Sequence, residues 1–262
     1  CSDDFQPENR EWFTKHILQC SFNSMVQGVF HVCDWDMWWT DDTQAVKNSV
    51  LRAISGGPIY VSDTLSRSRR EILMPLCLGN GRILRCDKPA VPLLNCVYQN
   101  PENCKAPFML QNTAGGCAYT SAFNLDSEND TVCGDFSPQD IDGLCGDSFV
   151  MYEYFTGVIK TVKRNERVNV TLADRNEFRL YAFMPENEVT FLGLHGKMIA
   201  AKTMSDITKS SAELAEGGTL MFVSQNEVTA VYSNGKPAKF DKSGELYTAN
   251  VGRGKVTVVT EK

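Results

Sequence analysis

The fold of this chain is best predicted from Arg52-Ala53-Ile54-Ser55-Gly56-Gly57-Pro58-Ile59-Tyr60-Val61-Ser62-Asp63. Its first residues complete an apolar helical face that begins at Val46. The helix should end at Gly56-Gly57, because glycine adopts a positive φ at little cost. Residues 58–62 then form a short apolar run, which is typical of a buried strand ending at Asp63. The stretch therefore predicts a helix, a glycine stop and a strand in direct succession.

Acidic residues recur at regular distances along the chain up to the end of this strand. Asp3, Asp34 and Asp63 are 31 and 29 residues apart, and an apolar run at residues 29–33 precedes Asp34 as a second predicted strand. About thirty residues is the size of one βα repeat. In a (β/α)₈ barrel, the carboxyl ends of the strands open into one mouth. The spacing therefore predicts that the three aspartates converge on one pocket.

The pattern changes near residue 105. Before it, apolar runs alternate with helical patterns; after it, alternating segments such as 178–184 are separated by turn signals such as Asn234-Gly235. The predicted fold class is therefore α/β plus all-β. Residues 1–105 should be the last βα units of a (β/α)₈ TIM barrel, and residues 106–262 an antiparallel β-sandwich domain.

The barrel prediction carries an expectation about length. A complete (β/α)₈ barrel needs about 250 residues, whereas about 100 residues here have the βα pattern. Cys1-Ser2-Asp3 begins at a predicted strand end with no strand before it. We therefore expect that an N-terminal half of the enzyme, with roughly five further units, precedes this sequence.

Composition argues against several functional classes. The net charge is −6 and no basic run occurs, so nucleic acid is not an expected partner. No apolar stretch approaches the roughly 20 residues that span a bilayer, so no membrane partner is expected. The ten cysteines include no C-x-x-C, and no histidine pair has zinc spacing. We predict free thiols in a reducing, cytoplasmic compartment, with no metal and no organic cofactor; a disulfide framework is the alternative.

The most informative candidate site is Asp34-Trp35-Asp36-Met37-Trp38-Trp39. Carboxylates accept hydrogen bonds from sugar hydroxyls, and indole faces cover the apolar side of a sugar ring. The alternative is that the tryptophans pack a barrel rim and that Asp34 caps a loop. Two further acidic positions also have alternative interpretations. Asp3-Asp4 could supply a general acid or form a turn, and Asp63 could contact a ligand or cap a helix.

Four blocks of the sequence match one enzyme family and occur in the same order. They are Ser2-Asp3-Asp4-Phe5, Asp34-Trp35-Asp36-Met37, the stretch Arg52–Asp63 and Ile83-Leu84-Arg85-Cys86. They closely resemble the raffinose synthase and α-galactosidase family, glycoside hydrolase family 36, in its seed-imbibition-like branch. The resemblance is strong over about residues 1–100, and it implies a retaining (β/α)₈ enzyme that uses two aspartates.

The resemblance also implies residue roles. The general acid/base of the family maps best onto Asp3, with Asp4 as the adjacent alternative. The family nucleophile follows a lysine-hydrophobic pair on an earlier strand, and no such motif precedes Asp3. The implied substrate-binding residues are Asp4, Asp34, Trp35, Asp36, Trp38 and Asp63.

The function implied by these roles is a portion of a retaining glycoside hydrolase. Its partner would be an α-galactoside oligosaccharide of the raffinose family, and the isolated chain should be inactive. Two alternatives remain open. One is a galactosyltransferase similar to raffinose synthase, in which sucrose replaces water as the acceptor. The other is a carbohydrate-binding module that does no catalysis.

Overall fold

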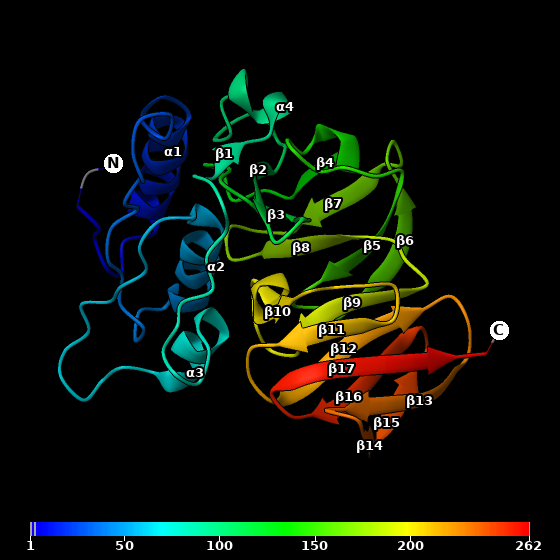
Figure 1. Ribbon diagram of the computed structural model, residues 1–262. Helices are drawn as coiled ribbons and strands as arrows, with labels where there is room; N and C mark the ends of the chain where they lie inside the picture. Colours follow the sequence, from blue (N-terminus) through cyan, green and yellow to red (C-terminus); the bar gives the residue numbers. More distant parts are fainter. Residues whose placement is uncertain (1, 3, 262) are drawn as a thin grey trace.

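The computed structural model describes residue 2 and residues 4–261 (Figure 1). This part of the chain is mostly sheet with few helices. The α-helices are α1 (Arg10–Gln27), α2 (Ala45–Ser55), α3 (Arg70–Leu73) and α4 (Leu94–Val97), and the short 3₁₀ helices are η1 (Met74–Leu76), η2 (Pro138–Asp140) and η3 (Ala200–Thr203).

Helix α2 forms and ends as its sequence predicts. It stops at Gly56, whose φ of 75° lies in the left-handed region that glycine adopts cheaply. Ten of its eleven residues are buried; the exception, Val46, is 38% exposed although it belongs to the predicted apolar face. Helix α1 begins where the Asn9 side chain accepts a hydrogen bond from the Trp12 amide. These are the two longest helices of the segment that precedes the sheets.

The predicted strand at residues 29–33 is wrong. Helix α1 extends to Gln27, a turn follows, and the side chains of Val29 and Phe30 are 76% and 83% exposed. The chain becomes extended later, where Trp38 and Val61 form a parallel bridge and the Ser62 amide donates to the Trp38 carbonyl at 3.2 Å. Every named strand pair in the described part is antiparallel, so the (β/α)₈ barrel stays a prediction.

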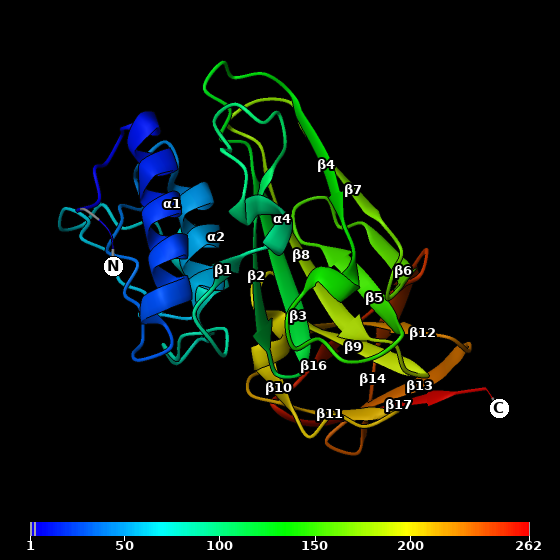
Figure 2. The same ribbon diagram turned by 90° about the horizontal axis from the view of Figure 1, so that it is seen from above.

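The first sheet is antiparallel and has six strands in the order β1-β2-β3-β8-β5-β6. The strands are β1 (Val91–Pro92), β2 (Phe108–Ala114), β3 (Cys117–Phe123), β8 (Phe178–Pro185), β5 (Ser148–Glu153) and β6 (Ile159–Lys163). A two-stranded pair, β4 (Val132–Phe136) with β7 (Val168–Leu172), lies on one side of it, and α1 and α2 lie on the other (Figure 2). This sandwiching explains why every residue of β2 and β3 is buried.

Two further antiparallel sheets follow toward the C-terminus. One contains β10 (Met204–Ser205), β11 (Ser211–Leu214), β17 (Gly254–Thr260), β13 (Val228–Ser233) and β14 (Lys236–Ala238). The other contains β15 (Phe240–Ser243), β16 (Leu246–Val251), β12 (Gly218–Ser224) and β9 (Val189–Leu194). The predicted turn at Asn234-Gly235 is confirmed: it joins β13 to β14, and both residues have positive φ.

The buried apolar side chains form two clusters. The larger one joins α1 and α2 to the first sheet and reaches from Phe5 to Met221. The smaller one lies between the two C-terminal sheets and includes the stacked pair Phe222 and Tyr247, whose ring centroids are 5.4 Å apart. The helical segment is therefore packed on the first sheet rather than attached by a flexible linker. The division of the chain at residue 105 into two domains stays a prediction.

Asn112 of β2 connects the helical segment to the sheet, and its removal should destabilise the fold. Its buried Nδ2 donates to the Ile54 carbonyl at 2.7 Å and to the Lys88 carbonyl at 2.6 Å. Asn112→Ala leaves both carbonyls unpaired, so we expect a loss of roughly 2–4 kcal/mol in the free energy of unfolding, measured with urea. The exposed Asn176→Ala is the control and should change it by less than about 0.5 kcal/mol; equal losses would contradict the assignment.

Candidate functional site

Three short segments that carry the predicted acidic residues are joined by hydrogen bonds. The Phe5 amide donates to Asp36 Oδ2 at 2.6 Å, which joins the segment of Asp4 to the loop of Asp34 and Asp36. The Tyr60 hydroxyl donates to Asp34 Oδ2 at 2.9 Å, which joins that loop to the residues before Asp63. Asp3, the predicted acid/base, lies outside the described residues.

The loop around Asp36 is a tight turn held by its own carboxylates. Asp34 Oδ1 accepts from the Asp36 amide at 2.8 Å, and Asp36 Oδ1 accepts from the Met37 amide at 2.7 Å. Asp36 has a φ of 66°, in the left-handed region that residues other than glycine rarely adopt. Such strain persists only where surrounding contacts determine the conformation, and it is common at functional sites.

Asp63 and Asp4 lie outside the turn that Asp34 and Asp36 form. Both carboxylate oxygens of Asp63 accept hydrogen bonds from Thr40, from its amide at 2.6 Å and from its hydroxyl at 2.8 Å. Asp63 therefore fixes the end of the Asp34–Thr40 loop. Asp4 is exposed, and its carbonyl accepts from Trp12 Nε1 at 2.7 Å. Their predicted contacts with a substrate stay predictions.

The three tryptophans of the loop are not equivalent. Trp35 and Trp38 are both 0% exposed, and Trp35 Nε1 donates to Ser24 Oγ at 2.9 Å. Neither buried ring offers a face to a sugar in this structure, so packing is the role that the structure shows for both. Trp39, which belongs to the predicted candidate stretch but not to the binding residues that the resemblance implies, is only half-buried, and its Nε1 donates to Ser62 Oγ at 3.0 Å. The accessible indole of this loop is therefore Trp39.

Sequence reasoning also missed Tyr60 and Arg52. Tyr60 is 42% exposed and hydrogen-bonded to Asp34, whereas Arg52 is fully buried beneath the loop. Alternation along the run at residues 58–62 could have indicated that Tyr60 points away from Ile59 and Val61. Arg52 gave no such signal, because an arginine on a helix is usually solvated.

The Tyr60 hydroxyl should lose its proton at an unusually high pH, and Asp34 should be one reason. Burial, then the hydrogen bond to Asp34 and its charge, raise the pKa of Tyr60 to about 12 from an ordinary value of 10.0. Because the folded pKa is the higher one, this contribution to stability is fully present below pH 10 and is lost as the pH rises toward 12. We expect Asp34→Asn to lower the Tyr60 pKa, while burial keeps it above its ordinary value. Ultraviolet difference titration, with Tyr60→Phe to assign the signal, measures this; an unchanged pKa would show that Asp34 does not contribute.

The described cysteines are free, as the sequence predicts. Several are buried, and burial raises the pKa of the Cys20 thiol to about 11 and that of the Cys117 thiol to about 12. These thiols are therefore protonated at neutral pH and act as small apolar groups. Among the described residues, no helix combines the length and apolar character that crossing a membrane requires.

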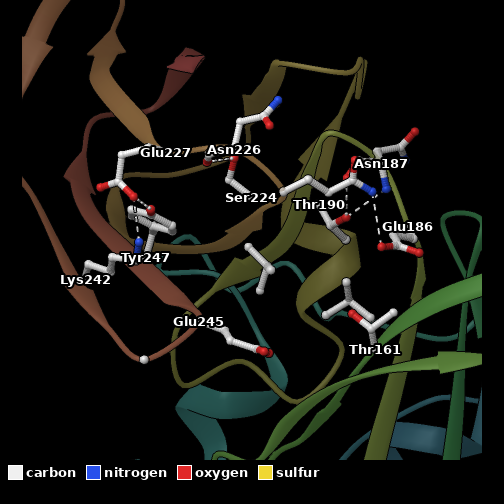
Figure 3. A pocket seen from close by; sticks show the side chains of 14 residues that line it. Thr161, Glu186, Asn187, Thr190, Ser224, Asn226, Glu227, Lys242, Glu245 and Tyr247 are labelled. Atoms are coloured by element: carbon white, nitrogen blue, oxygen red, sulfur yellow. Dashed lines mark hydrogen bonds and ion pairs between the residues drawn. The ribbon is translucent and has the colours of Figure 1, made fainter. Parts of the chain in front are cut away.

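A polar cleft lies apart from the acidic loop, between the first sheet and the C-terminal sheets (Figure 3). Its volume is about 290 Å³. Glu227 accepts from Lys242 Nζ at 2.8 Å and from the Tyr247 hydroxyl at 3.3 Å on one side. Within the described chain, the side chains of Asn226 and Glu245 make no hydrogen bond, so they are free to bind a polar ligand. None of the residues predicted from the sequence lines this cleft.

Comparisons with known proteins agree with the resemblance seen in the sequence. A galactinol–sucrose galactosyltransferase of Oryza sativa subsp. japonica is 29% identical over 194 residues, which covers 66% of this chain and 25% of that protein. A stachyose synthase of Pisum sativum is 36% identical over 86 residues, which covers 33% of this chain and 10% of that protein. The chain thus spans a quarter or less of the length of these two relatives.

A solved structure from Bacillus halodurans, described as a candidate α-N-acetylgalactosaminidase, is similar in fold. The two structures superpose with a TM-score of 0.53 at 14% sequence identity, over 71% of this chain and 46% of that chain. Residues 1–112, which carry the whole acidic loop, match the family model described as raffinose synthase or seed imbibition protein Sip1. Over these residues, the chain is similar to the raffinose synthase family.

Proposed function

We propose that this chain forms part of a retaining enzyme that acts on α-galactosides such as the raffinose-family oligosaccharides. The observation that carries the proposal is the junction of the three acidic segments, made by the hydrogen bonds from Phe5 to Asp36 and from Tyr60 to Asp34. The family match over residues 1–112 and the synthase relatives support the same substrate class. The proposed fold of this part is the last βα units of a (β/α)₈ barrel.

In the proposed reaction, Asp3 is the general acid/base. It protonates the leaving oxygen of the galactoside and then takes a proton from the acceptor. Asp4, its exposed neighbour, is the alternative. Asp34 and Asp36 accept hydrogen bonds from sugar hydroxyls, and the half-buried Trp39 covers an apolar face of the ring. The nucleophile is a second aspartate supplied by a part of the enzyme outside this chain.

The acceptor decides between two versions of this activity. Water as acceptor makes the enzyme an α-galactosidase, and a sugar such as sucrose makes it a galactosyltransferase. The rice relative is named for the transfer from galactinol to sucrose, which favours the transferase. Product analysis of the complete enzyme, incubated with galactinol in the presence and absence of sucrose, separates the two.

The chain on its own should bind the sugar without turning it over. Residues 1–112 contain no lysine-hydrophobic-aspartate triplet of the kind that carries the family nucleophile, and a retaining mechanism needs two carboxyl groups about 5–5.5 Å apart. We expect titration with raffinose to shift the NMR signals of Trp39 Nε1 and the Tyr60 ring. We expect no hydrolysis of p-nitrophenyl α-galactoside. Robust turnover would refute the assignment of the nucleophile. Unchanged NMR signals of both Trp39 and Tyr60 would refute the binding site.

A second candidate function is a carbohydrate-binding module without catalysis. The cleft of about 290 Å³ favours it, since free Glu245 and Asn226 side chains can exchange hydrogen bonds with a polyhydroxyl ligand. The same raffinose titration distinguishes the two sites. Shifts confined to residues around Tyr247 and Thr190 would favour the module, and shifts at Trp39 and Tyr60 favour the enzyme. The variant Glu245→Gln should weaken raffinose binding only if the sugar binds in the cleft.

A further inference from the structure

Arg52 lies at the centre of the acidic site although its side chain is 0% exposed. A guanidinium carries five N–H donors and keeps its charge at neutral pH, so burying one is costly unless its donors are paired. In the described chain, the Arg52 guanidinium contacts the Asp36–Met37 loop, α1, α2 and the residue that follows Asp4. A buried cation with contacts on all these segments is the best-placed group to fix their relative position.

The first contacts of Arg52 are with the backbone of the strained turn. Its Nη2 donates to the Met37 carbonyl at 2.9 Å, and its Nε donates to the Asp36 carbonyl at 3.4 Å. These two consecutive carbonyls directly follow the left-handed φ of Asp36. The turn is costly for a residue with a side chain. Hydrogen bonds to both carbonyls set the direction of the peptide that follows and so support the turn.

The remaining contacts connect the guanidinium to the helices and to Phe5. Nη1 donates to Asn48 Oδ1 at 2.8 Å, and Nη2 lies 3.0 Å from His16 Nε2. The guanidinium carbon lies 5.5 Å from the centroid of the Phe5 ring, within the range of a cation–π contact. Phe5 is also the residue whose amide donates to Asp36. Arg52 therefore contacts both partners of the hydrogen bond that joins the two acidic segments.

The charge of Arg52 suits this position. Burial lowers the pKa of Arg52 to about 10, while the nearby charges of Asp36 and Asp34 act in the opposite direction. The guanidinium therefore stays cationic at neutral pH, beneath a loop whose side chains are acidic. A lysine has the same charge but lacks the planar fork, so it cannot reach two consecutive carbonyls and Asn48 together.

We propose that Arg52 is the positioning residue of this site. Its guanidinium holds the Asp36 and Met37 carbonyls, so that Asp36 keeps its left-handed turn and its carboxylate stays on the Phe5 amide. The orientation of the Asp4 segment relative to the Asp34–Asp36 loop then depends on Arg52. The inference about geometry stands on these contacts, and its consequence for sugar binding rests on the proposed function.

The test compares Arg52→Lys with Lys47→Met. Lys47 is a buried cation on the same helix, 5% exposed, and its Nζ donates to the Arg175 carbonyl at 2.7 Å. In Arg52→Lys, we expect the Phe5 and Met37 amide protons to exchange about tenfold faster than in the unmodified chain and raffinose binding to weaken about tenfold. In Lys47→Met, both quantities should change by less than about twofold, although the thermal midpoint falls in both variants.

The outcomes separate this inference from the proposed function. If the unmodified chain binds no raffinose, the proposed function fails, and the amide exchange rates still decide the role of Arg52. Equal exchange at Phe5 and Met37 in the two variants would overturn the inference. If Arg52→Lys does not fold, the guanidinium signals of the unmodified chain decide instead. Hindered rotation with slowly exchanging Nε–H is expected, and a freely rotating guanidinium would overturn the inference.

Discussion

The variant Gly56→Ala should lose roughly 3–5 kcal/mol in the free energy of unfolding, a large fraction of the stability of an ordinary domain. Two costs add at this position. The φ of 75° is left-handed, and a Cβ built on Gly56 would lie 1.9 Å from the carbonyl oxygen of Lys88. That oxygen belongs to the backbone and also accepts from Asn112, so it has little freedom to move. Urea unfolding followed by circular dichroism measures the loss.

The matched control for this prediction is Gly81→Ala. Gly81 has a similar φ of 84°, but no heavy atom lies within 4 Å of the position that its Cβ would occupy. This variant isolates the backbone cost, which is about 1–2 kcal/mol. If both variants lose the same amount, the contact between Gly56 and the Lys88 carbonyl contributes nothing, and the packing of α2 against this segment is wrong.

Replacing the loop tryptophans by alanine should mainly lower stability at Trp35 and weaken sugar binding at Trp39. Trp35→Ala removes a fully buried indole and its hydrogen bond to Ser24, so we expect a loss of about 3–5 kcal/mol in the free energy of unfolding. Trp39→Ala removes a half-buried indole, and we expect a loss of less than about 2 kcal/mol. Only Trp39→Ala should weaken raffinose binding in the folded protein. Thermal unfolding and isothermal titration measure the two quantities.

An exposed aromatic residue outside the site provides the control for binding. Tyr98 is 86% exposed, and Tyr98→Ala should change neither stability nor raffinose binding measurably. If Trp39→Ala binds raffinose as well as the unmodified chain does, the indole is not part of the sugar site. If Trp35→Ala is as stable as the unmodified chain, its ring is not the packing residue that its burial indicates.

Local rules predicted the features that short segments determine by themselves. The end of α2 depends on the conformational freedom of Gly56, and the turn at Asn234-Gly235 depends on two residues that tolerate positive φ. The run at residues 29–33 misled the same rules. Its apolar composition is typical of a strand, but a strand also needs a neighbour to pair with, and composition says nothing about that neighbour.

The candidate site was only partly predictable for a similar reason. Regular spacing placed Asp34 and Asp63 on segments that do meet, since the Asp34–Thr40 loop contacts both Tyr60 and Asp63. Composition could not tell which of three neighbouring indoles stays accessible, because that depends on how α1 packs behind the loop. The role of Arg52 depends on contacts with residues as far away in the chain as His16 and Phe5, and no local pattern reports such contacts.

Helix α2 has one further consequence for how this molecule could be controlled. Over eleven residues, it offers the Arg52 side chain to the acidic loop and the Ile54 carbonyl to Asn112 of the first sheet. A short helix packed on all sides moves as a unit. A sequence change that shifts β2 should therefore displace the acidic loop through α2, and under the proposed function it would change sugar affinity without altering any of the proposed sugar-binding residues.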